Sequence, residues 1–209
     1  MAARGLLLFV LGLTKKVFFA DELAGVANPV FDGALAGAVP ATADAWLGAL
    51  GYTLQLYFDF SAYSDMAIGL GAMFGLRLPI NFDQPYRSTS IREFWRRWHM
   101  TLSRFFRDYL YIPLGGNRGG FVTTCALVLL TMTLCGLWHG AGWTFIAWGA
   151  LHGLCTVLNP PHRTYLSGYV CSDQPSHFCR SNYFYRAGCV VFAGAYQHAL
   201  LFSPRPASR

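Results

Sequence analysis

Three histidines lie in or beside apolar stretches of the chain, and imidazole is the side chain best suited to move protons near neutral pH. His139 has the most informative surroundings, because Trp138 and Gly140 flank it between two hydrophobic segments. Glycine lets a backbone or a ligand approach closely, and desolvation keeps an imidazole neutral and able to accept a proton. A neutral base in a water-poor site is what acyl transfer to a hydroxyl requires, since it takes the alcohol proton as the oxygen attacks a thioester carbonyl.

The other two histidines allow several interpretations. His99 stands between Arg96 and Ser103 on a polar helical face, where it could bind a polar or anionic ligand, orient a partner or face solvent. His152 lies inside an apolar stretch, one residue before Gly153. We expect it to act as a hydrogen-bond partner in helix packing.

Two carboxylates, Asp59 and Asp65, interrupt another apolar stretch. An ionisable residue in a membrane segment costs about 2.5–3.5 kcal/mol on insertion scales, so it normally faces protein or water. Two interpretations stay open: the helix is broken or reaches water at these residues, or they form a polar wall of a substrate path.

Other classes of chemistry lack their sequence signatures. The chain has no GxxxxGK[ST] or GxGxxG phosphate loop, no GxSxG nucleophile elbow and no HExxH motif,. Its six cysteines include no CxxC pair, so neither a zinc site nor a disulfide framework is supported,. We therefore expect no metal ion and no tightly bound cofactor.

The elements that hold these residues must be membrane helices, as the composition indicates. Of the 209 residues, 54% are hydrophobic and only 12% charged, with a mean hydropathy of +0.35. A soluble domain carries about 25% charged residues. The predicted fold is an all-α, polytopic integral membrane protein.

Apolar stretches long enough to cross a bilayer, about 20 residues each, occupy several parts of the chain. The first, at 5–20, is expected to end at Lys15 and Lys16, whose long side chains can reach the interface. Residues 21–44 are interpreted as a loop with one short helix. The remaining candidate spans are 45–76, 121–138 and 141–158.

Residues 91–111 follow a different pattern, with aromatic and basic side chains on opposite faces. Steps of three and four residues place the aromatics on one face and the arginines with His99 on the other. We predict a single amphipathic helix that lies in the membrane interface or packs against the protein at that level. The apolar face comprises Trp95, Trp98, Leu102, Phe105 and Tyr109, and the polar face Arg92, Arg96, His99, Ser103 and Arg107.

Positive charge is concentrated between residues 77 and 118, which hold eight arginines and three acids and so five of the six net positive charges. A basic block can bind nucleic acid or an anionic membrane face. The flanking apolar segments favour membrane lipid, and no nucleic-acid partner is expected. Short basic loops stay in the cytoplasm.

The last segment, 159–209, departs from the rest of the chain. It contains three of the six cysteines, three of the six histidines and five of the ten prolines, without a sustained helical or alternating period. We divide the chain into a membrane core at 1–158 and an atypical tail at 159–209, which we interpret as frame-shifted or disordered.

Several motifs together resemble the membrane-bound O-acyltransferase (MBOAT) family, and in particular its bacterial alginate O-acetyltransferase branch. The resemblance covers roughly residues 5–158. It rests on YFDFSAYSDMAIG at 57–69, NFDQPY at 81–86, FWRRWH at 94–99, RDYLYIPLGGNR at 107–118 and LWHGAGW at 137–143.

The resemblance implies transfer of an acyl group across a bacterial inner membrane by a multi-pass protein. A cytoplasmic donor, acetyl-CoA, would supply the group, and a periplasmic acetyltransferase partner or an exopolysaccharide such as alginate would accept it. The family's essential histidine falls on His139 and its second histidine on His99, so these are the expected catalytic residues. No cofactor-binding residue is assigned.

Two alternatives accompany this interpretation. Family members are about twice as long, so the chain is expected to be an incomplete MBOAT core, and an inactive truncated fragment or a scaffold is the first alternative. The second is a gradient-dependent membrane transporter in which Asp59, Asp65 and His152 line an ion path.

Overall fold

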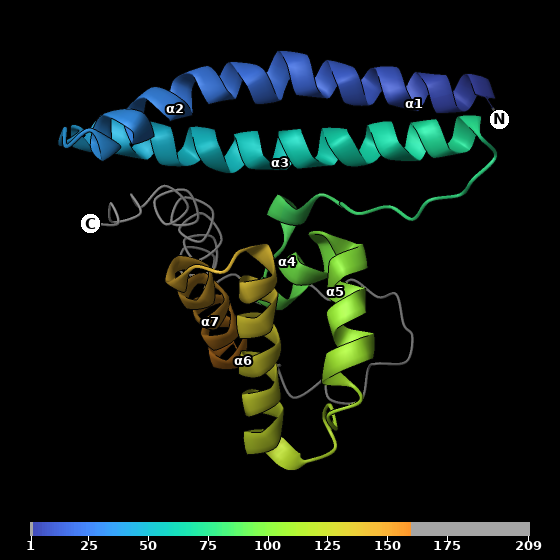
Figure 1. Ribbon diagram of the computed structural model, residues 1–209, viewed down its shortest axis with the longest axis vertical. Coiled ribbons are helices and arrows are strands. Elements are labelled where there is room, and N and C mark those ends of the chain that lie inside the picture. The colour runs from blue at the N-terminus through green and yellow to red at the C-terminus, as the bar shows by residue number, and fades with distance from the viewer. Residues whose placement is uncertain (1, 160–209) are drawn as a thin grey trace, which may run out of the picture.

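The structure is a computed structural model that describes residues 2–159, and every regular element in this range is helical. The all-α prediction is therefore confirmed. A long helical hairpin lies across a group of shorter helices (Figure 1). In chain order the elements are α1 (Ala2–Lys15), η1 (Lys16–Ala20), α2 (Asp21–Leu35), α3 (Thr42–Met73), η2 (Pro85–Arg87), α4 (Ile91–Arg97), α5 (Met100–Phe106), η3 (Arg107–Tyr111), α6 (Gly120–His139) and α7 (Trp143–Leu158).

The hairpin packs α1, η1 and α2 as one continuous rod against α3 (Figure 1). Small residues set the spacing of the two rods. A Cβ atom added at Gly12 would lie 2.8 Å from the carbonyl oxygen of Ala62, and one at Gly69 would lie 2.6 Å from that of Gly5. Backbones that approach this closely are typical of membrane helix pairs, where packing rather than the hydrophobic effect drives association.

The predicted loop at 21–44 is wrong for most of its length, because α2 continues the first helix to Leu35. The segment mixes Asp, Pro, Gly and Ala without a clear period, which favours a loop. Packing outweighs that local preference: Ala27 is fully buried, and its Cβ lies 3.7 Å from the position that a Cβ on Gly51 would occupy. Tertiary contacts commonly override intrinsic propensity in this way.

The predicted helix end at Lys15 and Lys16 is also wrong, because the rod passes through both residues with one π-helical turn, η1. Neither lysine has to reach an interface to find a partner. Lys15 Nζ lies 2.5 Å from Asp65 Oδ2, and Lys16 Nζ lies 2.7 Å from both Asp21 Oδ1 and Asp59 Oδ1. The aspartates of α3 therefore neutralise the lysines of the first rod.

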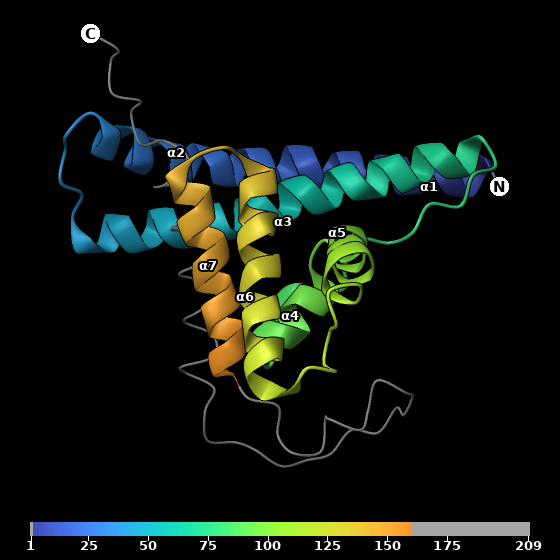
Figure 2. The ribbon, with the colours of Figure 1, turned by 60° about the horizontal axis from the view of Figure 1, so that its bottom comes forward.

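The second helical pair, α6 and α7, runs at a steep angle to the hairpin in both views and has its own close contact (Figures 1 and 2). A Cβ on Gly136 would clash with the carbonyl oxygen of Phe145, and a Cβ on Gly149 with that of Met132. Within the described residues, α6 is the one helix long and apolar enough to cross a membrane. The 16-residue α7 is a shorter apolar helix.

The amphipathic helix predicted at 91–111 is not a single helix. It divides into α4, α5 and η3, and the break falls at Trp98 and His99. His99 has φ 42° and ψ 56°, a left-handed conformation that ends one helix and begins the next,. No glycine or proline marks this break, so the local pattern could not reveal it.

The predicted division into residues 1–158 and an atypical tail at 159–209 concerns a segment that lies, from residue 160 onward, outside the described part of the chain. The interpretation of that tail as frame-shifted or disordered stays a prediction.

Candidate functional site: a histidine–tryptophan cluster

Three histidines and three tryptophans from α4, the α4–α5 corner, α6 and α7 form a chain of ring contacts, which we call the histidine–tryptophan cluster. Trp138 joins two of the histidines, with ring centroids 6.4 Å from His99 and 5.0 Å from His139. Trp148 in turn contacts both His139 and His152, with ring centroids 5.3 Å and 4.7 Å away. The cluster comprises Trp95, His99, Trp138, His139, Trp148 and His152.

His139 is the last residue of α6, and the turn that follows it explains the glycines of its motif. The N–H of Gly140 donates to the carbonyl of Leu137 at 3.2 Å, which closes the end of the helix. A Cβ on Gly140 would clash with the ring of Phe145 on α7. Glycine therefore lets α7 pack directly against the end of α6, and this places Trp148 edge-on against the half-buried imidazole.

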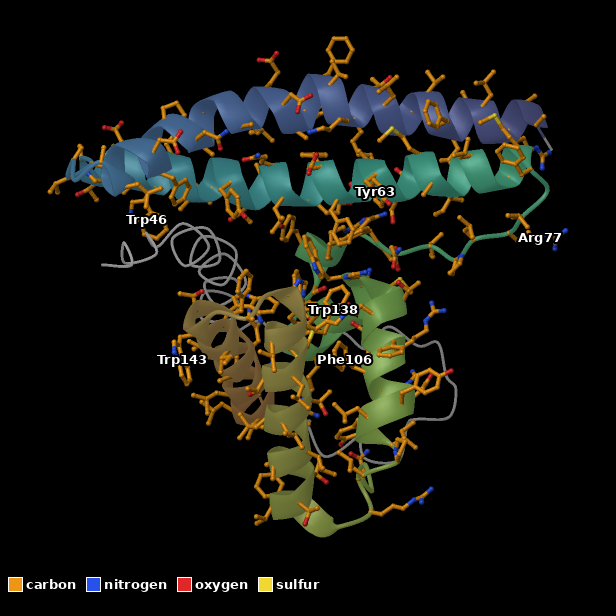
Figure 3. The ribbon with its side chains drawn as sticks, viewed as in Figure 1. Trp46, Tyr63, Arg77, Phe106, Trp138 and Trp143 are labelled. Carbon is orange, nitrogen blue, oxygen red and sulfur yellow. The ribbon has the colours of Figure 1, made fainter. Side chains whose placement is uncertain are left out.

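His99 reaches the cluster from the opposite side. Its ring meets the edge of Phe60 on α3 at 4.8 Å as well as Trp138. Burial, and to a lesser extent the nearby His139, lowers the pKa of His99 to about 4. This imidazole is therefore neutral around pH 7, because desolvation disfavours its charged form. Figure 3 shows Trp138 on the side of α6 that faces α5, with Trp143 on the outer side of α7.

His152 is the most buried of the three, with 3% of its surface exposed. Its ring meets Trp95 at 5.2 Å. Among residues 2–159, neither ring nitrogen of His152 and neither indole nitrogen of Trp95 and Trp148 has a hydrogen-bond partner. Within this part of the chain, the expectation that His152 serves as a hydrogen-bond partner in helix packing is not met, and its ring packs against Trp95 and Trp148.

Aromatic residues of α3 and the loop after it complete one wall of the cluster. Phe82 lies between Phe60 and Trp98, with both ring centroids 5.0 Å away. Tyr57 contacts Tyr86 at 5.3 Å. Tyr86 Oη donates to the carbonyl of Thr53 at 2.6 Å, which fixes the loop to the hairpin. Burial raises the pKa of this phenol, so it remains a donor at all ordinary pH values.

The aspartates singled out from the sequence lie elsewhere. Asp59 and Asp65 pair with lysines of the first rod, whereas the ring contacts of His152 are with Trp95 and Trp148. The structure thus places the two carboxylates on the face of α3 that meets the first rod, and Tyr57 and Phe60 on the face that meets the cluster. It does not bring together the three residues of the proposed ion path.

Part of the basic segment has a structural role. Arg97 pairs with Glu93 at 2.8 Å and with Asp83 at 3.7 Å. Arg92 Nε donates to the carbonyl of Thr156 at 3.2 Å, which ties α4 to the end of α7. Burial favours protonation of Glu93, but the hydrogen bonds from Thr89 and Arg97 outweigh it and lower its pKa. The polar face predicted to run from Arg92 to Arg107 is divided by the break at His99, and Arg92 at its start contacts α7.

Sequence reasoning did not single out Phe60, Phe82 or Trp148. A signal existed for Trp148, because it precedes His152 by four residues and so shares its helix face. Nothing in the local pattern placed Phe60 beside His99, since that contact joins α3 to a corner far along the chain.

Comparison with known proteins agrees with the motifs. Residues 3–160 match the MBOAT, membrane-bound O-acyltransferase family. The chain is 62% identical over 151 residues to the probable alginate O-acetylase AlgI of Azotobacter vinelandii, covering 72% of this chain and 30% of that protein. It is 51% identical over 163 residues to the peptidoglycan O-acetyltransferase of Helicobacter pylori (78% and 30%). Identity to the teichoic acid D-alanyltransferase of Bacillus subtilis is 32% over 155 residues (70% and 36%).

The chain spans about a third of the length of these relatives. The family match nevertheless covers most of the chain and includes both His99 and His139. The resemblance inferred from the sequence motifs is thereby confirmed, and the chain belongs to the membrane-bound O-acyltransferase family.

Proposed function

We propose that this chain is the histidine-bearing part of a membrane O-acyltransferase that serves the O-acetylation of an exopolysaccharide such as alginate. The observation that carries the proposal is the proximity of His99 and His139, which come from different segments and both contact Trp138. The names of the relatives supply the substrate class, since they include a probable alginate O-acetylase and a peptidoglycan O-acetyltransferase.

In the proposed step, His139 acts as the general base. Its neutral imidazole takes the proton of an acceptor hydroxyl while that oxygen attacks the carbonyl carbon of an acetyl thioester. The new C–O ester bond forms, the C–S bond breaks, and the leaving thiolate takes the proton back from the imidazolium. His99 supports the site as a second polar residue. The half-buried surroundings suit this role, because exclusion of water keeps a base neutral and protects the thioester from hydrolysis.

The proposal places the protein in the bacterial inner membrane as a multi-pass protein, with acetyl-CoA as the cytoplasmic donor. The arginine-rich segment faces the cytoplasm, in keeping with the location of short basic loops. The acceptor is a periplasmic acetyltransferase partner or the polysaccharide itself. The long apolar α6 and the exposed apolar side chains of the hairpin support membrane insertion.

The test measures O-acetyl ester on secreted polysaccharide from cells that carry the gene, its His139→Ala form or its Gly25→Ala form. Gly25 is a matched control, because no atom lies within 4 Å of an added Cβ there. Equal amounts of each protein in the membrane are confirmed by immunoblot. A general base contributes about 10²–10⁴-fold, so His139→Ala should abolish measurable transfer while Gly25→Ala retains it.

Two other results would contradict this proposal. Equal acetylation with and without His139 would mean that another group or another protein performs the transfer. Absence of acetylation from all three strains would favour an inactive fragment for this chain.

A further inference from the structure

The break between α4 and α5 gives His99 a backbone conformation that requires support from elsewhere in the molecule. His99 has φ 42° and ψ 56°. Non-glycine residues adopt this left-handed region uncommonly, and such residues persist where the surrounding structure fixes them. Because the imidazole of His99 contacts Trp138 and Phe60, whatever holds this corner also sets the position of the imidazole.

The support comes from the short segment Asn81, Phe82 and Asp83, which lies along the corner. The N–H of Asp83 donates to the carbonyl of Arg97 at 3.0 Å, just before the break. The N–H of Met100 donates to the carbonyl of Asn81 at 3.0 Å, just after it. Two backbone hydrogen bonds therefore bracket His99, and the ring of Phe82 packs between Phe60 and Trp98.

The side chain of Asn81 adds to this support at the start of α5. His99 is the N-cap residue of α5, yet its side chain makes no capping hydrogen bond. An N-cap side chain ordinarily accepts from the second or third N–H of its helix. Here Asn81 Oδ1 accepts instead, from the N–H of Thr101 at 3.2 Å and from Thr101 Oγ1 at 2.6 Å.

We propose that Asn81 is a positioning residue for the reaction: it caps α5 in place of His99 and so leaves the His99 imidazole directed at Trp138 and His139. This inference deepens the proposed function and rests on it for its catalytic consequence. A histidine that capped its own helix would turn its ring toward the backbone of Thr101. The capping carbonyl of Asn81 removes the need for that rotamer.

The test compares Asn81→Leu, which keeps the size and removes the acceptor, with Asn81→Asp, which keeps an acceptor oxygen. Histidine acylation by diethyl pyrocarbonate is followed residue by residue by mass spectrometry on the full chain in detergent. A hydrogen bond typically changes an equilibrium by about a factor of ten. We therefore expect Asn81→Leu to change the labelling rate of His99 about tenfold, with the buried His152 unchanged as internal control and Asn81→Asp close to wild type.

Where the wild type transfers acetyl groups, kinetics provide a second measurement. A misplacement of about 1 Å can cost on the order of 100-fold in rate, so Asn81→Leu should lower kcat about 10–100-fold with little change in KM. Asn81→Asp should restore most of kcat. A general loss of folding would alter both constants and the labelling of His152 as well.

The outcomes separate this proposal from the proposed function. Altered labelling of His99 in Asn81→Leu, together with an inactive wild type, would support the positioning role and overturn the proposed activity. Unchanged labelling of His99 in Asn81→Leu, or an Asn81→Asp variant that behaves like Asn81→Leu, would overturn the positioning role. If Asn81→Leu is not recovered folded, Asn81→Ala removes the same acceptor with less bulk, and unchanged His99 labelling in that variant overturns the positioning role.

Discussion

The close packing of the first rod on α3 predicts that equal substitutions in that rod have opposite effects on stability. At Gly12 an added Cβ would lie 2.8 Å from the carbonyl oxygen of Ala62 and 2.9 Å from the backbone nitrogen of Met66. Both atoms belong to the helical backbone of α3, so neither can move without the rods separating. At Gly25 the same Cβ would meet nothing within 4 Å.

These distances allow the free-energy changes to be worked out. Overpacking costs about 1–3 kcal/mol, and replacing a mid-helix glycine by alanine returns about 1 kcal/mol of helix propensity. Gly12→Ala should therefore lower the free energy of unfolding by up to about 2 kcal/mol. Gly25→Ala should raise it by about 0.5–1 kcal/mol, because it has the propensity gain without the clash.

The measurement is SDS-induced unfolding of the purified wild type, Gly12→Ala and Gly25→Ala in detergent at equal lipid content. The helical circular dichroism signal reports the unfolding. The informative quantity is the difference in the free energy of unfolding between the two variants, because any general effect of alanine is the same in both and cancels. A Gly12→Ala variant as stable as Gly25→Ala would refute the inferred packing of α1 on α3.

Two further predictions use the same unfolding assay. The side chains of the Lys15–Asp65 pair are 28% and 31% exposed, so its strength should lie between those of exposed and buried ion pairs. A double-mutant cycle of Lys15→Met and Asp65→Leu should therefore give a coupling free energy of about 1–2 kcal/mol. Additive effects of the two single substitutions would contradict this prediction. The pKa of His99 is lowered from 6.5 to about 4, so the unfolded state binds more protons between these values and stability falls as the pH falls from 6.5 to 4. His99→Gln should lose less stability over this interval than wild type, and identical slopes would refute the assignment.

The sequence predicted the long, regular elements and failed where distant segments decide the local structure. The apolar run that became α6 needed only its length and composition. The helix predicted at 91–111 failed because backbone bonds from Asn81 and Asp83 fix a break at His99 that no turn residue announces. The helix end predicted at Lys15 failed because its partner, Asp65, comes from α3.

The candidate site was predictable in its members but not in its geometry. Gly140 signalled a close approach beside His139, and the structure supplies the reason in the ring of Phe145. That His99 and His139 share Trp138 could not follow from either local pattern, because a helical face says nothing about which other helix it meets. Only the family motifs, taken together, placed both histidines in one site.

The two kinds of ionisable residue in this chain are accommodated by different physical means, and the difference bears on which of them can react. A carboxylate or an ammonium group must be compensated when it leaves water, and Asp59 and Asp65 accordingly have lysine partners on the neighbouring rod. Such paired charges are held in place by their partners. An imidazole can instead enter an apolar site neutral, at little electrostatic cost, and still accept a proton from a reacting hydroxyl. The cluster surrounds its histidines with aromatic rings, and among residues 2–159 no carboxylate forms an ion pair with them. Proton transfer inside such a fold is therefore expected at the histidines, and the aspartate–lysine pairs serve to hold α1 on α3.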